Sequence, residues 1–154
     1  MFKPLQLISI CALALITSCS KDEPPTKTDL LVAGPWKITY IEGKYKTSSQ
    51  NITGQILKFC NRDNRLIYSR DGAYTADPGQ NDCDGTETLL TGKWQWLSDE
   101  SQIRVSIAGI TNTFNITELT SEKLRYNIDG VPVDTNGDGK ADDTAHVWFT
   151  LAHD

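Results

Sequence analysis

Ten residues near the C-terminal end of the chain, 134–143, concentrate oxygen-bearing side chains in one short stretch. Counted from the first of them, the oxygens fall at positions one, three, five and nine, which are Asp134, Asn136, Asp138 and Asp142. Gly139 stands at position six, where such a loop must turn sharply, and Lys140 at position seven offers its backbone carbonyl. Carboxylate, amide and carbonyl oxygens aimed at one centre are the ligands of a hard divalent cation.

This spacing resembles the beginning of an EF-hand-type or dockerin-like Ca²⁺ loop. It departs from that pattern at position twelve, where Ala145 replaces the bidentate Glu, and we expect strands rather than helices on either side. Asp143 would then supply a carboxylate from another direction. The alternative is a solvated acidic hairpin loop, because Asn-Gly and Asp-Gly are ordinary turn dipeptides. We expect a structural Ca²⁺ of modest affinity, and Asp143-Thr144-Ala145 also resembles a short bacterial O-glycosylation motif on Thr144.

The N-terminus has the pattern of an export signal. Lys3 precedes a mostly apolar run over 5–16 that is too short to span a bilayer. Ile16-Thr17-Ser18-Cys19 resembles a bacterial lipobox, which implies cleavage before Cys19 and acylation of that residue. The alternative is an ordinary secretory signal with a chance cysteine. We therefore expect a signal peptide at 1–18, a charged, Pro-rich lipidated tether at 19–27 and a folded domain at 28–154.

The charged residues directly after Cys19 resemble the signal that sends Bacteroidota-type lipoproteins to the cell surface. The resemblance implies an outer-membrane lipoprotein exposed on the cell surface, with the periplasmic face as the alternative. Cys60 and Cys83 remain in the exported domain as an even pair, so an oxidising compartment predicts a disulfide between them. Such a bridge would constrain the unfolded chain by about 3 kcal/mol.

Alternation of apolar and polar residues with period two dominates the folded domain and predicts half-buried antiparallel strands. It is visible in seven segments, 36–40, 57–59, 94–96, 103–107, 114–116, 124–128 and 147–151. Short polar connections at 61–64, 70–72 and 98–100 are typical of hairpins. A helical turn over 28–33, capped by Thr28 or Asp29, is the only helix expected. The fold class is thus all-β, with eight or nine strands in a closed antiparallel barrel, or alternatively a β-sandwich.

Gly34-Pro35-Trp36 opens the first of these strands and resembles the Gly-x-Trp of lipocalins, in which the Trp plugs the closed end of the barrel. A wider set of positions resembles the lipocalin-like domain lipoproteins of Bacteroidota over most of residues 30–151. The matching residues are Phe59-Cys60, Asp63, Tyr74, Cys83, Gly92-Lys93-Trp94, Thr117–Thr120 and Leu124. The resemblance implies a lipocalin-like barrel.

An eight-stranded barrel is wide enough to be filled by side chains or to hold one small ligand. The residues that we expect to face inward and line an apolar ligand site are Trp36, Tyr40, Phe59, Trp94, Trp96, Phe114, Tyr126 and Phe149. The same residues could instead fill the barrel as a solid core. The first reading predicts a monomeric binding module for a small hydrophobic molecule, and the second a structural or interaction protein that contacts a protein or glycan.

Other function classes find little support in the composition. The net charge of −5 and the lack of a basic run argue against nucleic acid as a partner. The chain contains no nucleophile elbow, His-Cys metal cluster or Gly-rich phosphate loop. Of its two histidines, His146 is expected on an outer strand face and His153 in a mobile terminus. We therefore expect a protein that is not an enzyme.

Overall fold

The computed structural model describes residues 23–45, 48–81, 85, 88–133, 140 and 143–153. The elements are, in order, α1 (Lys27–Leu31), β1 (Trp36–Tyr45), β2 (Ser48–Asn51), α2 (Thr53–Ile56), η1 (Phe59–Asn61), β3 (Arg65–Tyr68), β4 (Ala73–Asp77), β5 (Leu90–Leu97), β6 (Gln102–Ile107), β7 (Ile110–Leu119), β8 (Lys123–Val133) and β9 (Asp143–His153). All strand pairs are antiparallel. In the described ranges, no helix has the length and apolar character needed to cross a membrane.

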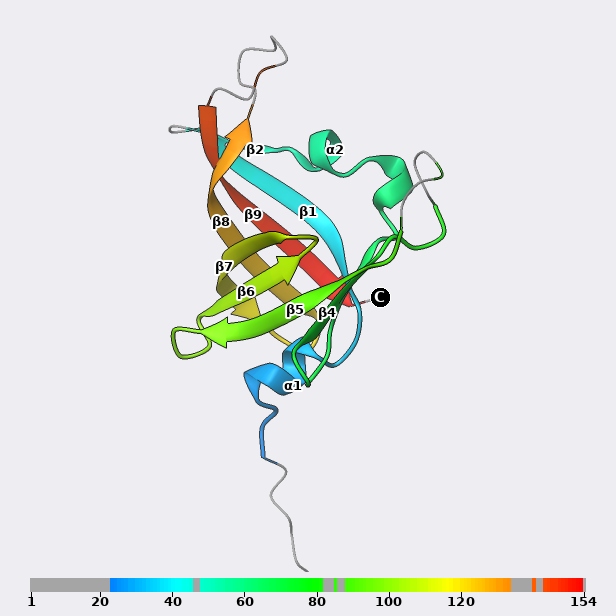
Figure 1. Ribbon diagram of the computed structural model, residues 1–154. Coiled ribbons are helices and arrows are strands. Elements are labelled where there is room, and N and C mark those ends of the chain that lie inside the picture. The colour runs from blue at the N-terminus through cyan, green and yellow to red at the C-terminus, as the bar shows by residue number, and fades with distance from the viewer. Residues whose placement is uncertain are drawn as a thin grey trace, which may run out of the picture.

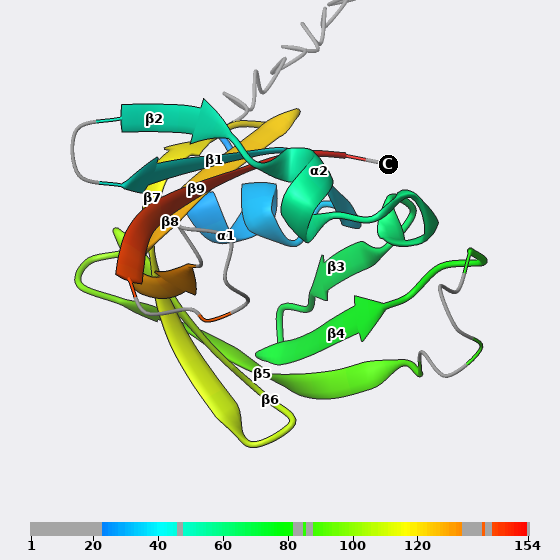
Figure 2. The same ribbon diagram turned by 90° about the horizontal axis from the view of Figure 1, so that it is seen from above.

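The sheet closes on itself through β1. Its nine strands follow the order β2-β1-β3-β4-β5-β6-β7-β8-β9, and β1 pairs in addition with β9. Trp36 lies opposite Leu66 of β3 on one side and His153 of β9 on the other. Eight strands therefore form a closed barrel, and β2 is an extra strand that pairs with the second half of β1 (Figures 1 and 2). The all-β fold with a closed antiparallel barrel, predicted from the alternation, is confirmed.

The hairpins that link neighbouring strands use tight turns. Ile107 and Ile110 are paired, so that only Ala108 and Gly109 connect β6 to β7, both with positive φ. Two-residue turns of this kind match the right-handed twist of the strands they join. At 61–64, 70–72 and 98–100 the predicted polar connections lie outside the strands, as expected.

A β-bulge changes the register of β1 between Ile38 and Tyr40. Ile38 lies opposite Leu151, which is fully buried, whereas Tyr40 lies opposite Thr150 on the outer face. Because the bulge adds one residue to β1, the side-chain alternation shifts by one position after it. Beyond the bulge, Ile41 and Gly43 therefore face inward. The sequence pattern, which continued the alternation without a bulge, predicted Tyr40 on the inner face instead.

The segment 57–59 is not a strand. Leu57 follows α2, and Phe59 begins the short 3₁₀ helix η1 with a side chain that is 81% exposed. The helical turn at the start of the domain is confirmed as α1, but its cap differs from the prediction. Thr26 is the N-cap and accepts a hydrogen bond from the Asp29 backbone N–H, while the Asp29 carboxylate accepts one from the Thr26 backbone N–H. This is a capping box, which satisfies two N–H groups at once.

Candidate functional site

The barrel interior is the largest apolar region of the described protein. Alternate residues of the strands face it and form one buried cluster with Leu31 of α1. The buried members of this cluster are Leu31, Trp36, Tyr68, Tyr74, Trp94, Ile103, Val105, Leu124, Tyr126 and Leu151, and six of its partly buried members are Ile38, Trp96, Ile107, Phe114, Ile116 and Phe149. The interior is thus lined by aromatic and aliphatic side chains from all eight barrel strands, β1 and β3–β9.

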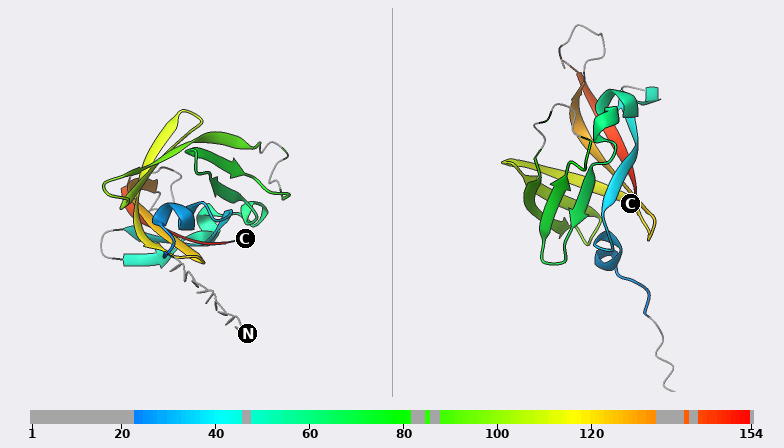
Figure 3. Two further views of the ribbon diagram at one scale, coloured as in Figure 1. Left: turned by 90° about the horizontal axis from the view of Figure 1, so that it is seen from below. Right: turned by 90° about the vertical axis from the view of Figure 1, so that its right-hand side faces the viewer.

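Helix α1 covers one end of this interior, as the view from below shows (Figure 3). Leu31, the last residue of α1, is fully buried, and its carbonyl accepts a hydrogen bond of 2.9 Å from the Trp36 indole Nε1–H. The Trp96 indole donates to the Thr28 hydroxyl at 3.0 Å. Five residues form too short a helix to be stable alone, so these contacts to β1 and β5 hold α1 across the barrel end.

Polar contacts fasten the outside of α1 to two hairpin turns. Arg70, in the β3–β4 turn, donates to the Asp29 carboxylate at 2.5 Å, and Lys27 donates to the Glu100 carbonyl in the β5–β6 turn. Hydrogen bonding from Thr26, followed by that from Arg70, lowers the pKa of Asp29 to about 2. Both side chains of the pair remain open to solvent, 65% exposed for Arg70 and 39% for Asp29, so the pair serves mainly to orient the helix.

The ring of His153 packs on Trp36 at the same end of the barrel. Their centroids lie 3.9 Å apart and the rings are tilted by 32°. The expectation that His153 belongs to a mobile terminus is therefore wrong, because β9 extends through it and pairs with β1. A terminal residue inside a strand is held by the backbone ladder, which sequence position alone does not reveal.

A second buried cluster lies toward the opposite end of β1. Ile41, Ile52, Ala145 and Val147 form it, and Leu57, Ile128 and Val131 pack against it. Gly43 makes room for Ile52, because a Cβ on Gly43 would lie 2.6 Å from the Ile52 Cδ1 atom. The segment around α2 therefore packs directly on the β1 backbone.

Aromatic rings face one another on two sides of the interior. Tyr68 packs on Tyr74 with centroids 5.1 Å apart and meets Trp94 edge-on at 5.8 Å. Tyr126 lies between Phe114 and Phe149, at 4.7 and 5.3 Å. Rings at these separations attract one another through their quadrupoles in addition to the apolar area they bury.

Six of the eight residues predicted to line the interior do so. Trp36, Trp94 and Tyr126 are buried, and Trp96, Phe114 and Phe149 pack against the buried cluster. The predictions for Tyr40 and Phe59 are wrong. Tyr40 is turned outward by the β1 bulge and is 37% exposed, and Phe59 lies on η1 under the guanidinium of Arg62.

Sequence reasoning missed two tyrosines of the interior, Tyr68 and Tyr74. They lie directly opposite each other on β3 and β4, which are only four and five residues long. Each of these strands has only two inward residues, Leu66 and Tyr68 on β3 and Tyr74 and Ala76 on β4, so the alternation is too short to stand out. The sequence signal that could have indicated this hairpin is the polar turn at 70–72, which has apolar residues on both sides.

Burial changes the acidity of these interior phenols. Desolvation raises the pKa of Tyr74 to about 12. It also raises the pKa of Tyr68 and of Tyr126 well above the ordinary range, and for both of them the nearby phenols add a smaller effect in the same direction. The three hydroxyl groups are therefore neutral hydrogen-bond donors and acceptors at any physiological pH.

Four predicted metal ligands, Asp134, Asn136, Asp138 and Asp142, lie outside the described residues. Lys140 is described as a single exposed position, and Asp143 begins β9 opposite Val133. Within the described ranges, His, Cys, Asp and Glu side chains do not gather in groups of three or more that could hold a metal ion. The calcium loop therefore stays a prediction.

The cysteines are likewise only partly described. Cys60 is half-buried in η1, whereas Cys83 and the expected lipidation site Cys19 lie outside the described residues. The disulfide between Cys60 and Cys83 and the acylation of Cys19 remain predictions.

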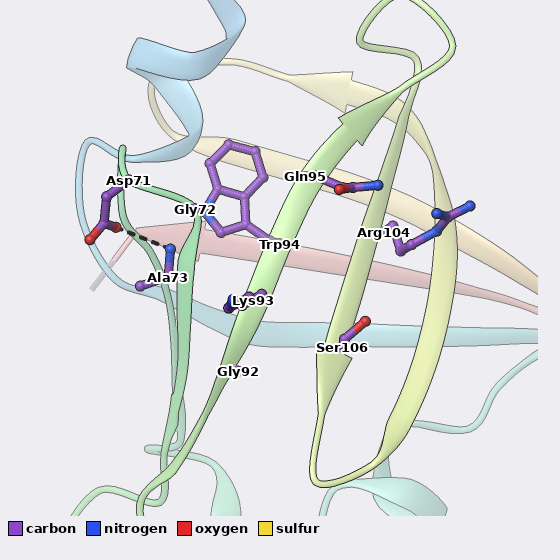
Figure 4. Close-up of a pocket in the computed structure, with 9 residues that line it drawn as sticks. All are labelled: Asp71, Gly72, Ala73, Gly92, Lys93, Trp94, Gln95, Arg104 and Ser106. Atoms are coloured by element: carbon purple, nitrogen blue, oxygen red, sulfur yellow. Dashed lines mark hydrogen bonds between the residues drawn. The ribbon is translucent and has the colours of Figure 1, made fainter.

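The outer face of the barrel has a groove of about 600 Å³ beside the β3–β4 turn (Figure 4). Its lining residues are Asp71, Gly72, Ala73, Gly92, Lys93, Trp94, Gln95, Arg104 and Ser106. Lys93 lies opposite Ser106 and Gln95 opposite Arg104, all on the face of β5 and β6 that points away from Trp94 and Val105. The polar side chains of the groove thus belong to the outer face of the barrel, whereas Trp94 is shared with the interior cluster.

His146 lies on the outer face, as predicted. Its ring packs on Trp148 with centroids 3.9 Å apart, and its Nδ1 atom contacts the Asp129 carboxylate. Nearby, side-chain amides form a chain across three strands, from Gln102 to Asn115 and from Asn115 to Asn127. This chain leaves Asn127 only 8% exposed although it faces away from the interior.

Comparisons with known proteins find similarity in three dimensions only. No protein-family description matches the sequence, and no curated protein matches it. Among solved structures, the bovine lipocalin allergen Bos d 2 has 19% sequence identity, a TM-score of 0.43 and coverage of 77% of this chain and 70% of its own. A DUF4847 family protein from Bacteroides vulgatus has 10% identity, a TM-score of 0.48 and coverage of 84% and 98%. The fold assignment rests on the strand pairing itself.

The raised phenol pKa values predict that the protein loses stability at alkaline pH. The folded state holds these protons more tightly than the unfolded chain, in which tyrosine titrates near pH 10. The free energy of unfolding should therefore be unaffected by the phenols below about pH 10 and fall as the pH rises toward about 12. Urea unfolding between about pH 8 and 12 measures this fall, which should be smaller in Tyr74→Phe. An identical fall in Tyr74→Phe would contradict the assignment.

Proposed function

We propose that the protein is a cell-envelope binding module that holds one small, mostly apolar molecule inside its barrel. The observation that carries the proposal is the interior itself: a closed eight-stranded sheet whose inward face is lined by aromatic side chains from β1, β3, β4, β5, β7, β8 and β9. Small-molecule sites in proteins are usually lined in this way, with a few polar groups that orient the ligand.

The two ends of the barrel differ in a way that suits such a role. Helix α1 covers one end and is fixed there by Trp36, Trp96 and the turns that contain Arg70 and Glu100. The other end is bordered by the β1–β2 hairpin and the segment around α2, which rests on Gly43 through Ile52. A ligand would therefore enter from the α2 side and lie against the aromatic rings.

We also infer a binding role rather than a catalytic one. The sequence contains none of the nucleophile, metal or phosphate motifs of common enzymes. In the described interior, the buried residues are apolar side chains and phenols, without an acid–base pair. Such an interior recognises a ligand by shape and hydrogen bonding.

Filling the interior should block ligand binding, whereas the same change on the outer face should not. Val105 is 5% exposed and faces inward, and its neighbour Arg104 faces outward. With the neutral fluorescent probe N-phenyl-1-naphthylamine, we expect saturable binding to the native protein and to Arg104→Phe. Phenylalanine at position 105 would take up interior volume that the probe needs, so the affinity of Val105→Phe for the probe should fall about tenfold or more.

Cooperative melting of both variants is the control for folding in that titration. Equal affinities of the two variants would contradict the interior site. If the native protein shows no saturable binding at all, the barrel is filled and the alternative below applies.

The alternative is an interaction protein that uses its outer surface. The polar groove beside the β3–β4 turn favours this reading, because Lys93, Gln95 and Arg104 offer hydrogen-bond donors on an otherwise acidic protein. Exposed apolar side chains such as Phe59 and Ile110 add contact area outside the barrel. A protein or glycan partner would then bind without entering the barrel.

We propose further that the protein is exported, acylated at Cys19 and bound to the outer membrane, on the cell surface or on its periplasmic face. The lipobox-like sequence ending at Cys19 and the Pro-rich residues after it support this proposal. Oxidation during export would join Cys60 to Cys83.

Mass spectrometry and fractionation test the envelope proposal together. We expect the mature chain to begin at Cys19, to carry acyl chains and to contain no free thiol at Cys60 or Cys83. Cys19→Ser should release the protein from membranes, because the lipid is its expected anchor, while Cys11→Ser, a change within the signal, should leave it bound. A Cys19→Ser protein that still pellets with membranes, or a mature chain with two reactive thiols, would refute the corresponding part.

A structural Ca²⁺ in the loop 134–143 remains part of the proposal. Val133 and Asp143 are paired where β8 and β9 meet, so the loop starts and ends at adjacent positions. Four Asp residues and one Lys lie within these ten positions, and a divalent cation would offset their repulsion.

Calcium should therefore raise the melting temperature of the protein, by about 3 °C or more at saturation. The rise should vanish on chelation and in Asp138→Ala. Glu122→Ala, which removes the same charge from the exposed β7–β8 connection, should keep it. An unchanged melting temperature of the native protein on addition of calcium would exclude the site.

A further inference from the structure

Three tyrosines of the barrel interior differ from all the other polar groups there. Tyr68, Tyr74 and Tyr126 are 4%, 7% and 5% exposed and lie on β3, β4 and β8. Tyr68 and Tyr74 are cross-strand neighbours with rings 5.1 Å apart. Tyr126 packs between Phe114 and Phe149 on another side of the interior and belongs to the same buried cluster. The three phenols therefore line one interior.

Each neighbouring indole N–H donates a hydrogen bond to an acceptor of the protein. Trp36 donates to the Leu31 carbonyl, Trp94 to the Ser69 carbonyl at 2.8 Å and Trp96 to the Thr28 hydroxyl. Among the described residues, by contrast, no group accepts a hydrogen bond from, or donates one to, the hydroxyls of Tyr68, Tyr74 and Tyr126. The same fold that satisfies three indoles thus leaves three phenols without a protein partner.

The three hydroxyl oxygens are not shut off inside packed side chains. None of them is among the described side-chain atoms that are both fully buried and without a hydrogen-bond partner. Each therefore reaches space that a small molecule can occupy, and its partner there is water or a ligand rather than the chain. Phenylalanine would fill the same position on each strand but could not hydrogen-bond to such a partner.

The surroundings limit the chemistry of this partner. The charged side chains of the described barrel strands lie outside the interior cluster, whose buried members are apolar or phenolic. A carboxylate or phosphate placed there would be desolvated without a neighbouring cation. A neutral carbonyl oxygen, with two lone pairs, can accept hydrogen bonds from two phenols at once.

We propose that Tyr68, Tyr74 and Tyr126 form the polar end of the barrel site and select a neutral, mostly apolar molecule that carries a carbonyl oxygen. This inference rests on the proposed function, since it requires a ligand in the interior. The aromatic rings of Trp94, Phe114 and Phe149 then contact the apolar part of the molecule, and the phenols donate to its oxygen.

Two probes with the same carbon skeleton separate binding in the interior from selection of a carbonyl group. Butyrophenone and n-butylbenzene differ only in a carbonyl group at the carbon next to the ring. Calorimetric titration of the native protein should give saturable binding of both, with about tenfold tighter binding of the ketone, as expected for one or two buried hydrogen bonds. The ratio of the two affinities is the measured quantity.

Removal of the hydroxyl groups should change this ratio alone. In Tyr68→Phe and in Tyr126→Phe the ketone should lose most of its advantage while n-butylbenzene keeps its affinity. Tyr40→Phe, on the outer face, is the matched control and should keep the native ratio. The melting temperatures of Tyr68→Phe and Tyr126→Phe without ligand should equal or exceed that of the native protein, because no protein hydrogen bond is lost.

Each other outcome overturns a defined claim. If both probes bind but the ratio is the same in the native protein and the interior variants, the phenols do not select the ligand and the binding module stands. A lower melting temperature of both interior variants would mean that the hydroxyls already have partners in the free protein. If neither probe binds saturably, the interior site itself is refuted.

Discussion

Backbone hydrogen bonds between β1 and β9 join the first barrel strand to the last. This pairing closes the sheet into a barrel with an interior. Trp36 stands at the point where β1 has partners on both sides, Leu66 and His153. Without this double pairing, β3 and β9 would be exposed edges and the aromatic face of the sheet would be open to water. The burial of the aromatic rings and the separation of inner from outer residues therefore both depend on closure of the barrel.

The polar groups of the interior are handled in two different ways. Indole N–H groups are directed to carbonyls or a hydroxyl of the protein, and two of them thereby attach α1 to the barrel. The phenols of β3, β4 and β8 have no such partners among the described residues, and their hydroxyl oxygens reach space outside the packed side chains. Phenylalanine would pack equally well at these positions, so the hydroxyl groups are not needed for packing. The contrast between indoles with partners and phenols without them therefore indicates where a ligand would form hydrogen bonds, which the apolar lining alone does not.

Sequence alternation predicted the barrel and most of its interior because period two holds wherever a strand is regular. Trp94 and Trp96 on β5, Ile103 and Val105 on β6, and Tyr126 on β8 all face inward as expected. It failed at Tyr40, where a single extra residue in β1 reverses the alternation. It also failed at Phe59, where the apolar pair with Leu57 belongs to a helical connection. Bulges and short helices depend on contacts with distant residues, such as Ile52 on Gly43, which a local pattern does not contain.

The position of α1 also determines which end of the barrel lies nearest to the preceding part of the chain. The described residues that precede α1, from 23 onward, leave the barrel at the end that this helix covers, while the β1–β2 hairpin and α2 lie at the other end (Figure 1). An attachment of the chain before residue 23 would therefore lie on the side of the barrel end that α1 covers. The end of the barrel that carries the β1–β2 hairpin and α2 therefore faces away from the attachment point, and the support does not cover it.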